Sequence, residues 1–157
     1  MSLNKETIER FYSAFRQKDH QAMNACYSEQ VVFSDPVFGI LYDDQVRNMW
    51  AMLCGQAKDL VISYGDIEEL DEEYATCKWV ARYSFSATGR KVENHVKAFM
   101  RFKDGKIIEH SDAFHLSKWA AQALGWKGVL FGWSGFLQRR IQKNARISLQ
   151  RFMEKNK

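Results

Sequence analysis

The sequence predicts a single α+β domain in which helices come first and an antiparallel sheet follows. Apolar residues recur at helical spacing in 3–18 and 43–57, whereas alternation of apolar and polar residues dominates 60–115. Two hairpin signals separate the later strands, Thr88-Gly89-Arg90 and Lys103-Asp104-Gly105-Lys106. Helices followed by a strand meander, instead of helices alternating with strands, indicate the α+β class.

Local signals place the individual elements. Asp19 is the expected N-cap of a second short helix that ends near residue 27. The β-branched and aromatic segment 31–35 predicts a short strand, and Pro36 keeps the residue before it extended. Further strands are predicted at 60–64, 74–87, 91–102 and 106–115, and further helices at 117–124 and 134–155.

Composition narrows the class of protein. Five Trp, six Tyr and eleven Phe in 157 residues favour a large core or an apolar cavity. No apolar run reaches the length of a membrane-spanning helix, and the charged N-terminus is unlike a signal peptide. The cysteines at 26, 54 and 77 lie far apart, which argues against a disulfide framework or a zinc cluster and favours a cytoplasmic location.

The net charge of +4 conceals two different regions. Residues 1–116 carry a net −4, and residues 117–157 carry a net +8. The predicted C-terminal helix is therefore basic, and its apolar face is expected to pack across the acidic body or a partner subunit. Contact with a membrane surface is the alternative, since Trp126, Phe131 and Trp133 stand beside the positive charge. No nucleic-acid partner is expected, because the aromatic platform of an RNA-binding sheet is missing.

Five segments carry a family resemblance: FYSAFRQKD (11–19), VVFSDPVFG (31–39), QVRNMW (45–50), RFKDGKIIEH (101–110) and WAAQALG (119–125). In this order they resemble the NTF2-like superfamily, and within it the branch of ketosteroid isomerases and SnoaL-like polyketide cyclases. The resemblance implies a cone-shaped, cystatin-like fold in which a curved antiparallel sheet wraps around N-terminal helices. It also implies a homodimer and an NTF2-like domain over 1–125. The basic segment 126–157 departs from the compact isomerases and is expected to be a helical extension of that domain.

The cone of this fold encloses an apolar pocket, which is the default ligand site. A small apolar molecule is the expected ligand, because rings and soft sulfur suit a planar or polyketide-like compound. The residues expected to line the pocket are Phe11, Tyr12, Met49, Trp50, Ala98, Met100 and Phe114.

Asp35 is the first candidate catalytic residue. The segment VVFSDPVFG matches the isomerase segment whose Asp is the general base that moves a proton next to a carbonyl. Partial burial suits this role because it raises the pKa of a carboxyl and makes it a better base. The alternative is an Asp that hydrogen-bonds the turn after Pro36.

Two departures from the isomerases argue against genuine steroid isomerisation. The resemblance places Phe11 and Ala98 where those enzymes hold a Tyr and a protonated carboxylic acid that stabilise the enolate. Neither side chain here can donate a hydrogen bond. Tyr12 replaces the lost hydroxyl only if the helix register shifts.

The last predicted strand offers a second pair of polar groups. Strict alternation puts Ile108, His110, Asp112 and Phe114 on one face, and the apolar ends of this set indicate that the face looks inward. A carboxylate beside a histidine fixes its tautomer, which predicts an acid/base pair with Asp112 orienting His110. The alternative is a hydrogen-bonded polar pair at the mouth of the cone.

The remaining motifs exclude other chemistry. His95 alternates out of phase with the inward face, so it is expected on the outer surface unless a β-bulge reverses it. Neither HxH nor HExxH occurs, and no metal site is expected. Walker, GxGxxG and nucleophile-elbow motifs are absent from the sequence, so no cofactor is expected.

These observations favour a SnoaL-like protein that binds a small apolar carbonyl compound and isomerises, cyclises or hydrates it by acid/base catalysis. Asp35 would be the base, His110 the acid or shuttle, and Asp112 its partner. The alternative is a non-catalytic ligand-binding or interaction module, which the loss of donors at Phe11 and Ala98 supports.

Overall fold

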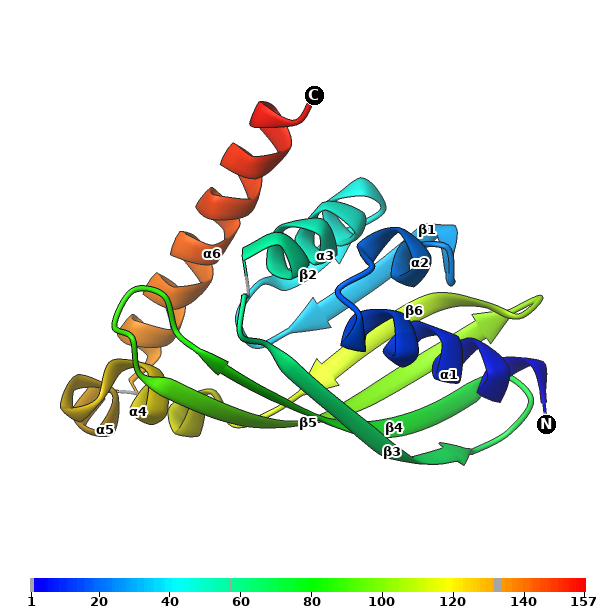
Figure 1. Ribbon diagram of the computed structural model, residues 1–157, viewed down its shortest axis with the longest axis horizontal. Coiled ribbons are helices and arrows are strands. Elements are labelled where there is room, and N and C mark those ends of the chain that lie inside the picture. The colour runs from blue at the N-terminus through cyan, green and yellow to red at the C-terminus, as the bar shows by residue number, and fades with distance from the viewer. Residues whose placement is uncertain (1, 57, 132–133) are drawn as a thin grey trace.

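A six-stranded curved sheet forms the centre of the computed structural model, which describes residues 2–56, 58–131 and 134–157 (Figure 1). The strand order is β2-β1-β6-β5-β4-β3. The strands are β1 Tyr27–Asp35, β2 Gly39–Tyr42, β3 Val61–Glu69, β4 Tyr74–Ser84, β5 Lys91–Lys103 and β6 Lys106–Ala113. Neighbours are antiparallel except β1 and β6, which run parallel. The predicted α+β class and the NTF2-like architecture are confirmed.

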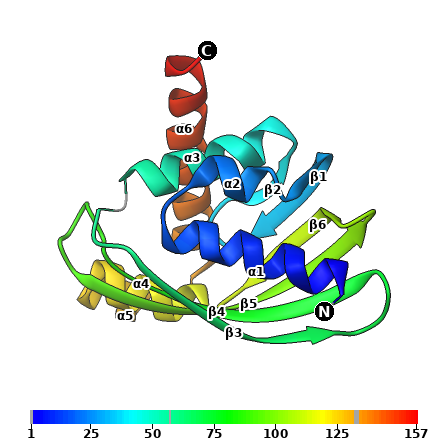
Figure 2. The ribbon, with the colours of Figure 1, turned by 45° about the vertical axis from the view of Figure 1, so that its right-hand side comes forward.

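Three N-terminal helices cover one face of the sheet, as Figures 1 and 2 show: α1 Leu3–Arg16, α2 His20–Asn24 and α3 Asp44–Gln56. The Ser2 hydroxyl caps α1, and the Asp19 carboxylate caps α2 by accepting from the Ala22 N–H at 3.1 Å. The predicted cap at Asp19 is therefore confirmed. Every third or fourth residue of α1 is buried against the sheet, so the helix is held by packing of this apolar face.

The sheet has six strands, one more than the five predicted, and the additional strand is β2. The second helix ends at Asn24, three residues earlier than predicted, and β1 begins at Tyr27. A short β2 after the turn at Pro36 pairs antiparallel with β1. The parallel contact of β1 with β6 then joins this hairpin to the meander β3–β6. That contact connects strands far apart in the sequence, so no local signal announces it.

A register shift corrects the predicted inward face of the last strand. The pairing of β5 with β6 slips between Arg101 and Phe102. Ile107 therefore faces the core with no exposed surface, whereas Ile108, the predicted inward residue, is only partly buried. The alternation resumes beyond the shift, where His110 and Asp112 are both buried. The shift adds one residue to β6 in the manner of a β-bulge.

The C-terminal region forms three helices: α4 Leu116–Leu124, α5 Trp126–Phe131 and α6 Gly135–Lys155. Leu116 and Trp119 of α4 pack on a second apolar cluster that includes Val92 of β5. Helix α5 lies between the two predicted C-terminal helices, in a glycine-rich segment for which no separate helix was predicted. A Cβ at Gly128 would lie 1.9 Å from the Ala120 carbonyl oxygen, so glycine is what lets α5 pack tightly against α4.

Helix α6 contacts α3, which crosses in front of it in Figure 2. Leu149 is 2% exposed, which confirms that the basic helix packs on the body. Trp126, named for membrane contact, is 67% exposed, while Trp133 and the Phe131 side chain lie outside the described residues. Within the described parts of the chain, no helix is long and apolar enough to cross a membrane.

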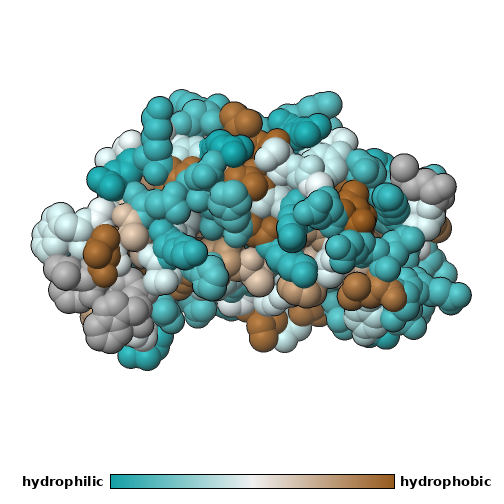
Figure 3. Space-filling model, turned by 90° about the horizontal axis from the view of Figure 1, so that it is seen from below, coloured by the Kyte–Doolittle hydropathy of each residue, from teal (hydrophilic) through white to brown (hydrophobic). Residues whose placement is uncertain are grey.

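The sheet surface away from α1 is dominated by charge. Arg101 contacts Glu109 and Arg82 contacts Glu93 across neighbouring strands, and Arg101 also contacts Glu73, which lies just before β4. Figure 3, which views the molecule from below, shows a mostly hydrophilic face with scattered apolar residues. The expected homodimer stays a prediction.

Candidate functional site

His110 lies in the middle of a buried chain of hydrogen bonds on the inner face of the sheet. Its Nδ1 is 2.7 Å from the Tyr27 hydroxyl oxygen, and its Nε2 is 2.9 Å from Oδ1 of Asp112. The Tyr27 oxygen also accepts from the Trp50 indole N–H at 2.9 Å. Because Tyr27 accepts from Trp50, its own proton is free to go to Nδ1. In this arrangement Nδ1 accepts from Tyr27, and the hydrogen on Nε2 is donated to Oδ1 of Asp112.

Asp112 completes the chain. Its side chain is 3% exposed and that of His110 is inaccessible. Oδ1 of Asp112 accepts from His110 Nε2 and, at 3.3 Å, from the Trp79 indole N–H. Burial raises the pKa of Tyr27 well above its ordinary value, so its hydroxyl remains a donor. Each donor in this chain meets an acceptor, as buried polar groups require.

Asp35 ends β1 at the rim of the same face. Its Oδ1 accepts the backbone N–H of Val37 at 2.9 Å and that of Phe38 at 2.6 Å, which is an Asx turn. Burial raises the pKa of Asp35 from 3.8 to about 7, although the two N–H groups and His110 oppose this. The nearby Asp112 carboxylate raises the pKa further. Oδ1 caps the turn, and among the described residues none donates a hydrogen bond to Oδ2.

Parallel pairing of β1 with β6 brings these three side chains together. Phe33 lies opposite His110, and the pairing continues by one further residue on each strand. The next positions, Asp35 and Asp112, therefore fall side by side, on the face that bears Phe33 and His110. Two carboxyl groups and one imidazole thus share one corner of the inner face.

The residues expected to line a pocket lie in or against the core. Phe114 is partly buried between two apolar clusters, and the others are at most 2% exposed: Phe11, Tyr12, Met49, Trp50, Ala98 and Met100. Rings fill the space around His110, since Trp50 stacks on the imidazole at 6.2 Å and Phe33 meets it edge-on at 5.0 Å. Such contacts stabilise a packed interior.

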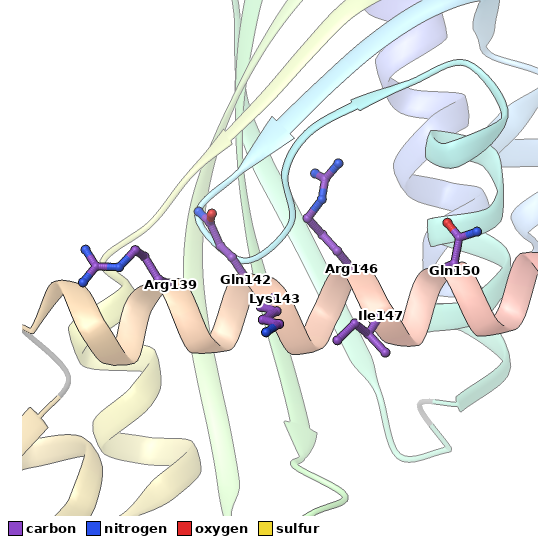
Figure 4. Close-up of a pocket in the computed structure, with 6 residues that line it drawn as sticks. All are labelled: Arg139, Gln142, Lys143, Arg146, Ile147 and Gln150. Atoms are coloured by element: carbon purple, nitrogen blue, oxygen red, sulfur yellow. The ribbon is translucent and has the colours of Figure 1, made fainter.

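Two hollows in the surface lie elsewhere. One of about 540 Å³ runs along α6 (Figure 4), and one of about 600 Å³ adjoins the start of α1. Neither is lined by a residue of the expected pocket. A ligand pocket under the sheet stays a prediction.

Both Phe11 and Tyr12 point into the core, so Tyr12 reaches the interior without a shift of helix register. The Tyr12 ring stacks on Tyr64 at 5.4 Å. Its hydroxyl is buried and has no hydrogen-bond partner among the described residues. Burial raises the pKa of Tyr12 well above its ordinary value, so the hydroxyl keeps its proton.

Sequence reasoning missed Tyr27 and Trp79. Tyr27 was assigned to the end of a helix, and Trp79 was read as core. No spacing signal marks Tyr27, because the pairing of β1 with β6 is interrupted between Tyr27 and Val32 and the alternation does not run through. The bond from Trp79 to Asp112 depends on strand register, which the sequence does not show.

The other candidate ligands are dispersed. His95 has a 69% exposed side chain on the outer face and lies 3.4 Å from Glu93, as its alternation predicts. Cys26, Cys54 and Cys77 are buried and free. The described residues contain no group of three or more His, Cys, Asp or Glu side chains placed to hold a metal ion.

Comparison with known proteins identifies the fold. Curated protein sequences give no significant match. A Catenulispora acidiphila protein with a ketosteroid isomerase-like fold, in complex with trimethylamine, is similar with a TM-score of 0.66 at 13% identity, covering 75% of this chain and 92% of that one. IdmH from Streptomyces antibioticus, described as a "putative polyketide cyclase", has a TM-score of 0.64 at 21% identity. The match covers 76% of this chain and 96% of that one.

A protein from Xanthomonas campestris pv. campestris, also described as a "putative polyketide cyclase", has a TM-score of 0.64 at 18% identity. The match covers 76% of this chain and 96% of that one. Likeness at these identities shows the fold. The sequence model of the SnoaL-like domain matches residues 8–110, which is more than half of the chain. This chain therefore belongs to the SnoaL-like domain family.

Proposed function

We propose that this SnoaL-like protein binds a small apolar carbonyl compound under its curved sheet and isomerises or cyclises it by acid/base catalysis. The environment of the Asp35 carboxyl is the observation that supports this proposal. This carboxyl is half-buried, Oδ1 is fixed by the turn, and Oδ2 receives no hydrogen bond from the described residues. A pKa of about 7 suits a base that works near neutral pH.

The proposed chemistry moves only a proton and an electron pair. Asp35 takes a proton from the carbon next to the carbonyl, and the electron pair of the broken C–H bond forms an enolate. In isomerisation the same proton returns to another carbon. In cyclisation the enolate carbon bonds to a second carbonyl carbon, whose oxygen then receives the proton. Both routes balance without a further reactant, and two structural neighbours are described as cyclases.

His110 and Asp112 form the polar wall beside Asp35. If His110 acts as the acid, it must first break one of its two hydrogen bonds, because both ring nitrogens are engaged. We therefore propose that His110 orients Asp112, and that the Asp112 carboxylate keeps Asp35 a stronger base. This reverses the order of the predicted roles, in which Asp112 orients His110.

Hydrogen–deuterium exchange tests the proposal without the natural substrate. The probe is α-tetralone, an apolar bicyclic ketone with exchangeable hydrogens next to its carbonyl, followed by NMR in D₂O. We expect the protein to accelerate exchange, with a rate that rises with pH through about 7 as Asp35 ionises. Asp35→Asn should reduce the rate by about 100-fold or more. Asp44→Asn, at a side chain that is 85% exposed, is the matched control and should leave it unchanged.

One set of observations favours a second function, a non-catalytic binding module. Phe11 and Ala98 supply no donor for an enolate, and rings occupy the interior around His110. Quenching of tryptophan fluorescence by α-tetralone, with no acceleration of exchange, would support this alternative. If the protein shows no quenching by α-tetralone and no acceleration of exchange, the proposed catalysis is contradicted.

A further inference from the structure

Helix α6 holds the turn that carries Asp35. Arg146 Nη1 donates to the carbonyl oxygens of Phe38 at 2.8 Å and Ile40 at 3.0 Å. One helical turn earlier, Gln142 Nε2 donates to the Pro36 carbonyl oxygen at 3.1 Å. In Figure 4 both side chains extend from α6 towards the turn between β1 and β2, whereas Lys143 and Ile147 point away from it.

The same stretch of backbone binds Asp35 on its other side. The peptide group between Pro36 and Val37 accepts from Gln142 through its C=O and donates to Asp35 Oδ1 through its N–H. Phe38 likewise donates its N–H to Asp35 and accepts from Arg146 at its C=O. The C=O and N–H of a trans peptide point in opposite directions, so this backbone links the helix to the carboxyl. Hydrogen bonds in series also polarise and strengthen one another.

The helix is itself fixed, so it can hold the turn in place. Leu149 is buried in the main core, and Ala145, Phe152 and Met153 pack against that core. Gly39 lies beside these contacts, and its φ of +72° is a left-handed conformation that favours glycine.

We propose that Arg146 and Gln142 are positioning residues for Asp35, acting through the turn that they bind. The helix keeps Oδ1 of Asp35 in its Asx turn. This inference rests on the role proposed above for Asp35, but the contacts that carry it are independent of any substrate. The matched SnoaL-like region ends at residue 110, so the positioning residues belong to the sequence beyond it.

The test is the pKa of Asp35, measured by NMR titration at the Val37 and Phe38 amides that it binds. The titratable groups that act on Asp35 are Asp112 and His110 on β6, and the charged Arg146 of α6 binds the turn. Burial is the largest cause of the raised pKa, so a turn that opens to water lowers it. Simple loss of a positive charge would raise it instead. An opened turn also loses the two N–H groups that lower the pKa, but burial is the larger cause, so the net change is a fall. Gln142→Met reports positioning with no change of charge.

In Arg146→Met we expect the pKa of Asp35 to fall from about 7 by about one unit or more. Gln142→Met, which removes one hydrogen bond and no charge, should lower it by less. Lys143→Met removes the same charge from the same helix without touching the turn, and Arg146→Lys restores charge and a donor. The pKa should stay within a few tenths of a unit in Lys143→Met and recover partly in Arg146→Lys.

An unchanged or raised pKa in both Arg146→Met and Gln142→Met would overturn the inference. If Arg146→Met does not fold, Gln142→Met decides, because it keeps the helix charge and all apolar contacts of α6. Failure of the proposed catalysis would appear elsewhere, as ketone exchange that persists in Asp35→Asn. The two failures are therefore distinguishable.

Discussion

The two ends of the candidate site differ in how their polar groups are satisfied. Around His110, the ring nitrogens, the Tyr27 hydroxyl and one Asp112 oxygen are all hydrogen-bonded, and the side chains are sealed by rings. At Asp35 the carboxyl is half-buried, one oxygen is bound, and a helix from outside the matched family region holds the turn.

This difference predicts opposite effects on stability. A matched polar network contributes to the free energy of unfolding, because removing one member strands its partners in the core. A half-buried carboxyl has lost part of its hydration, so its charged form lowers the free energy of unfolding. A group that lowers stability, such as ionised Asp35, is a candidate for function. The closed network around His110 is expected first of all to stabilise the fold.

The largest expected effect breaks the closed network. His110→Phe keeps the ring shape but leaves the Tyr27 hydroxyl without an acceptor and Asp112 with the longer bond from Trp79 in place of two donors. We expect the free energy of unfolding in urea at pH 7 to fall by about 3 kcal/mol. His95→Phe, on the exposed face, should change it by less than about 0.5 kcal/mol. A loss below about 1 kcal/mol in His110→Phe would show that the network is not structural.

The next effect has the opposite sign. Asp35 has a pKa of about 7 in the fold and near 3.8 when unfolded, so the folded state holds its proton more tightly. The free energy of unfolding should therefore fall as pH rises from about 4 through about 7, and the loss is complete above that. Asp35→Asn keeps an oxygen for the Val37 and Phe38 amides and removes the charge.

We expect Asp35→Asn to be more stable than the wild type by about 2 kcal/mol at pH 8, and this gain should vanish near pH 4. Urea denaturation across this range measures the difference. Asp44→Asn, at an exposed carboxyl, should show no such pH dependence. A variant that loses stability at pH 8 would place Asp35 with the satisfied groups of the His110 network.

Much of the fold could be predicted because its signals are local. The Asp19 cap, the Asp104-Gly105 hairpin and the amphipathic α1 depend on neighbours in the chain, and the structure contains all three. Strand β2 has four residues between a turn and a helix cap, too few for a periodic pattern. The register shift at Arg101 places Ile107 in the core where Ile108 was predicted, and because both residues are isoleucine the sequence does not reveal the shift.

The site was predictable in its residues but not in its connections. Alternation put His110 and Asp112 on one face, and the family resemblance singled out Asp35. Their closeness depends on the parallel contact of β1 with β6, which joins positions about 77 residues apart. Arg146 was read only as part of a basic helix, because its two carbonyl partners lie more than 100 residues earlier in the chain.

Tyr12 gives the smallest expected effect and the finest test of the comparison. It lies among the sealed rings, yet its hydroxyl has no partner among the described residues, so it resembles Asp35 in being unsatisfied. Tyr12→Phe should therefore leave the free energy of unfolding unchanged or raise it by up to about 1 kcal/mol. Tyr83→Phe is the matched control, because that hydroxyl accepts from the Trp119 indole at 2.7 Å and its removal should cost about 1 kcal/mol. If Tyr12→Phe instead loses as much free energy of unfolding as Tyr83→Phe, a buried water satisfies the Tyr12 hydroxyl, which then belongs with the closed network. If Tyr12→Phe gains free energy of unfolding, the hydroxyl is free to donate to a ligand oxygen.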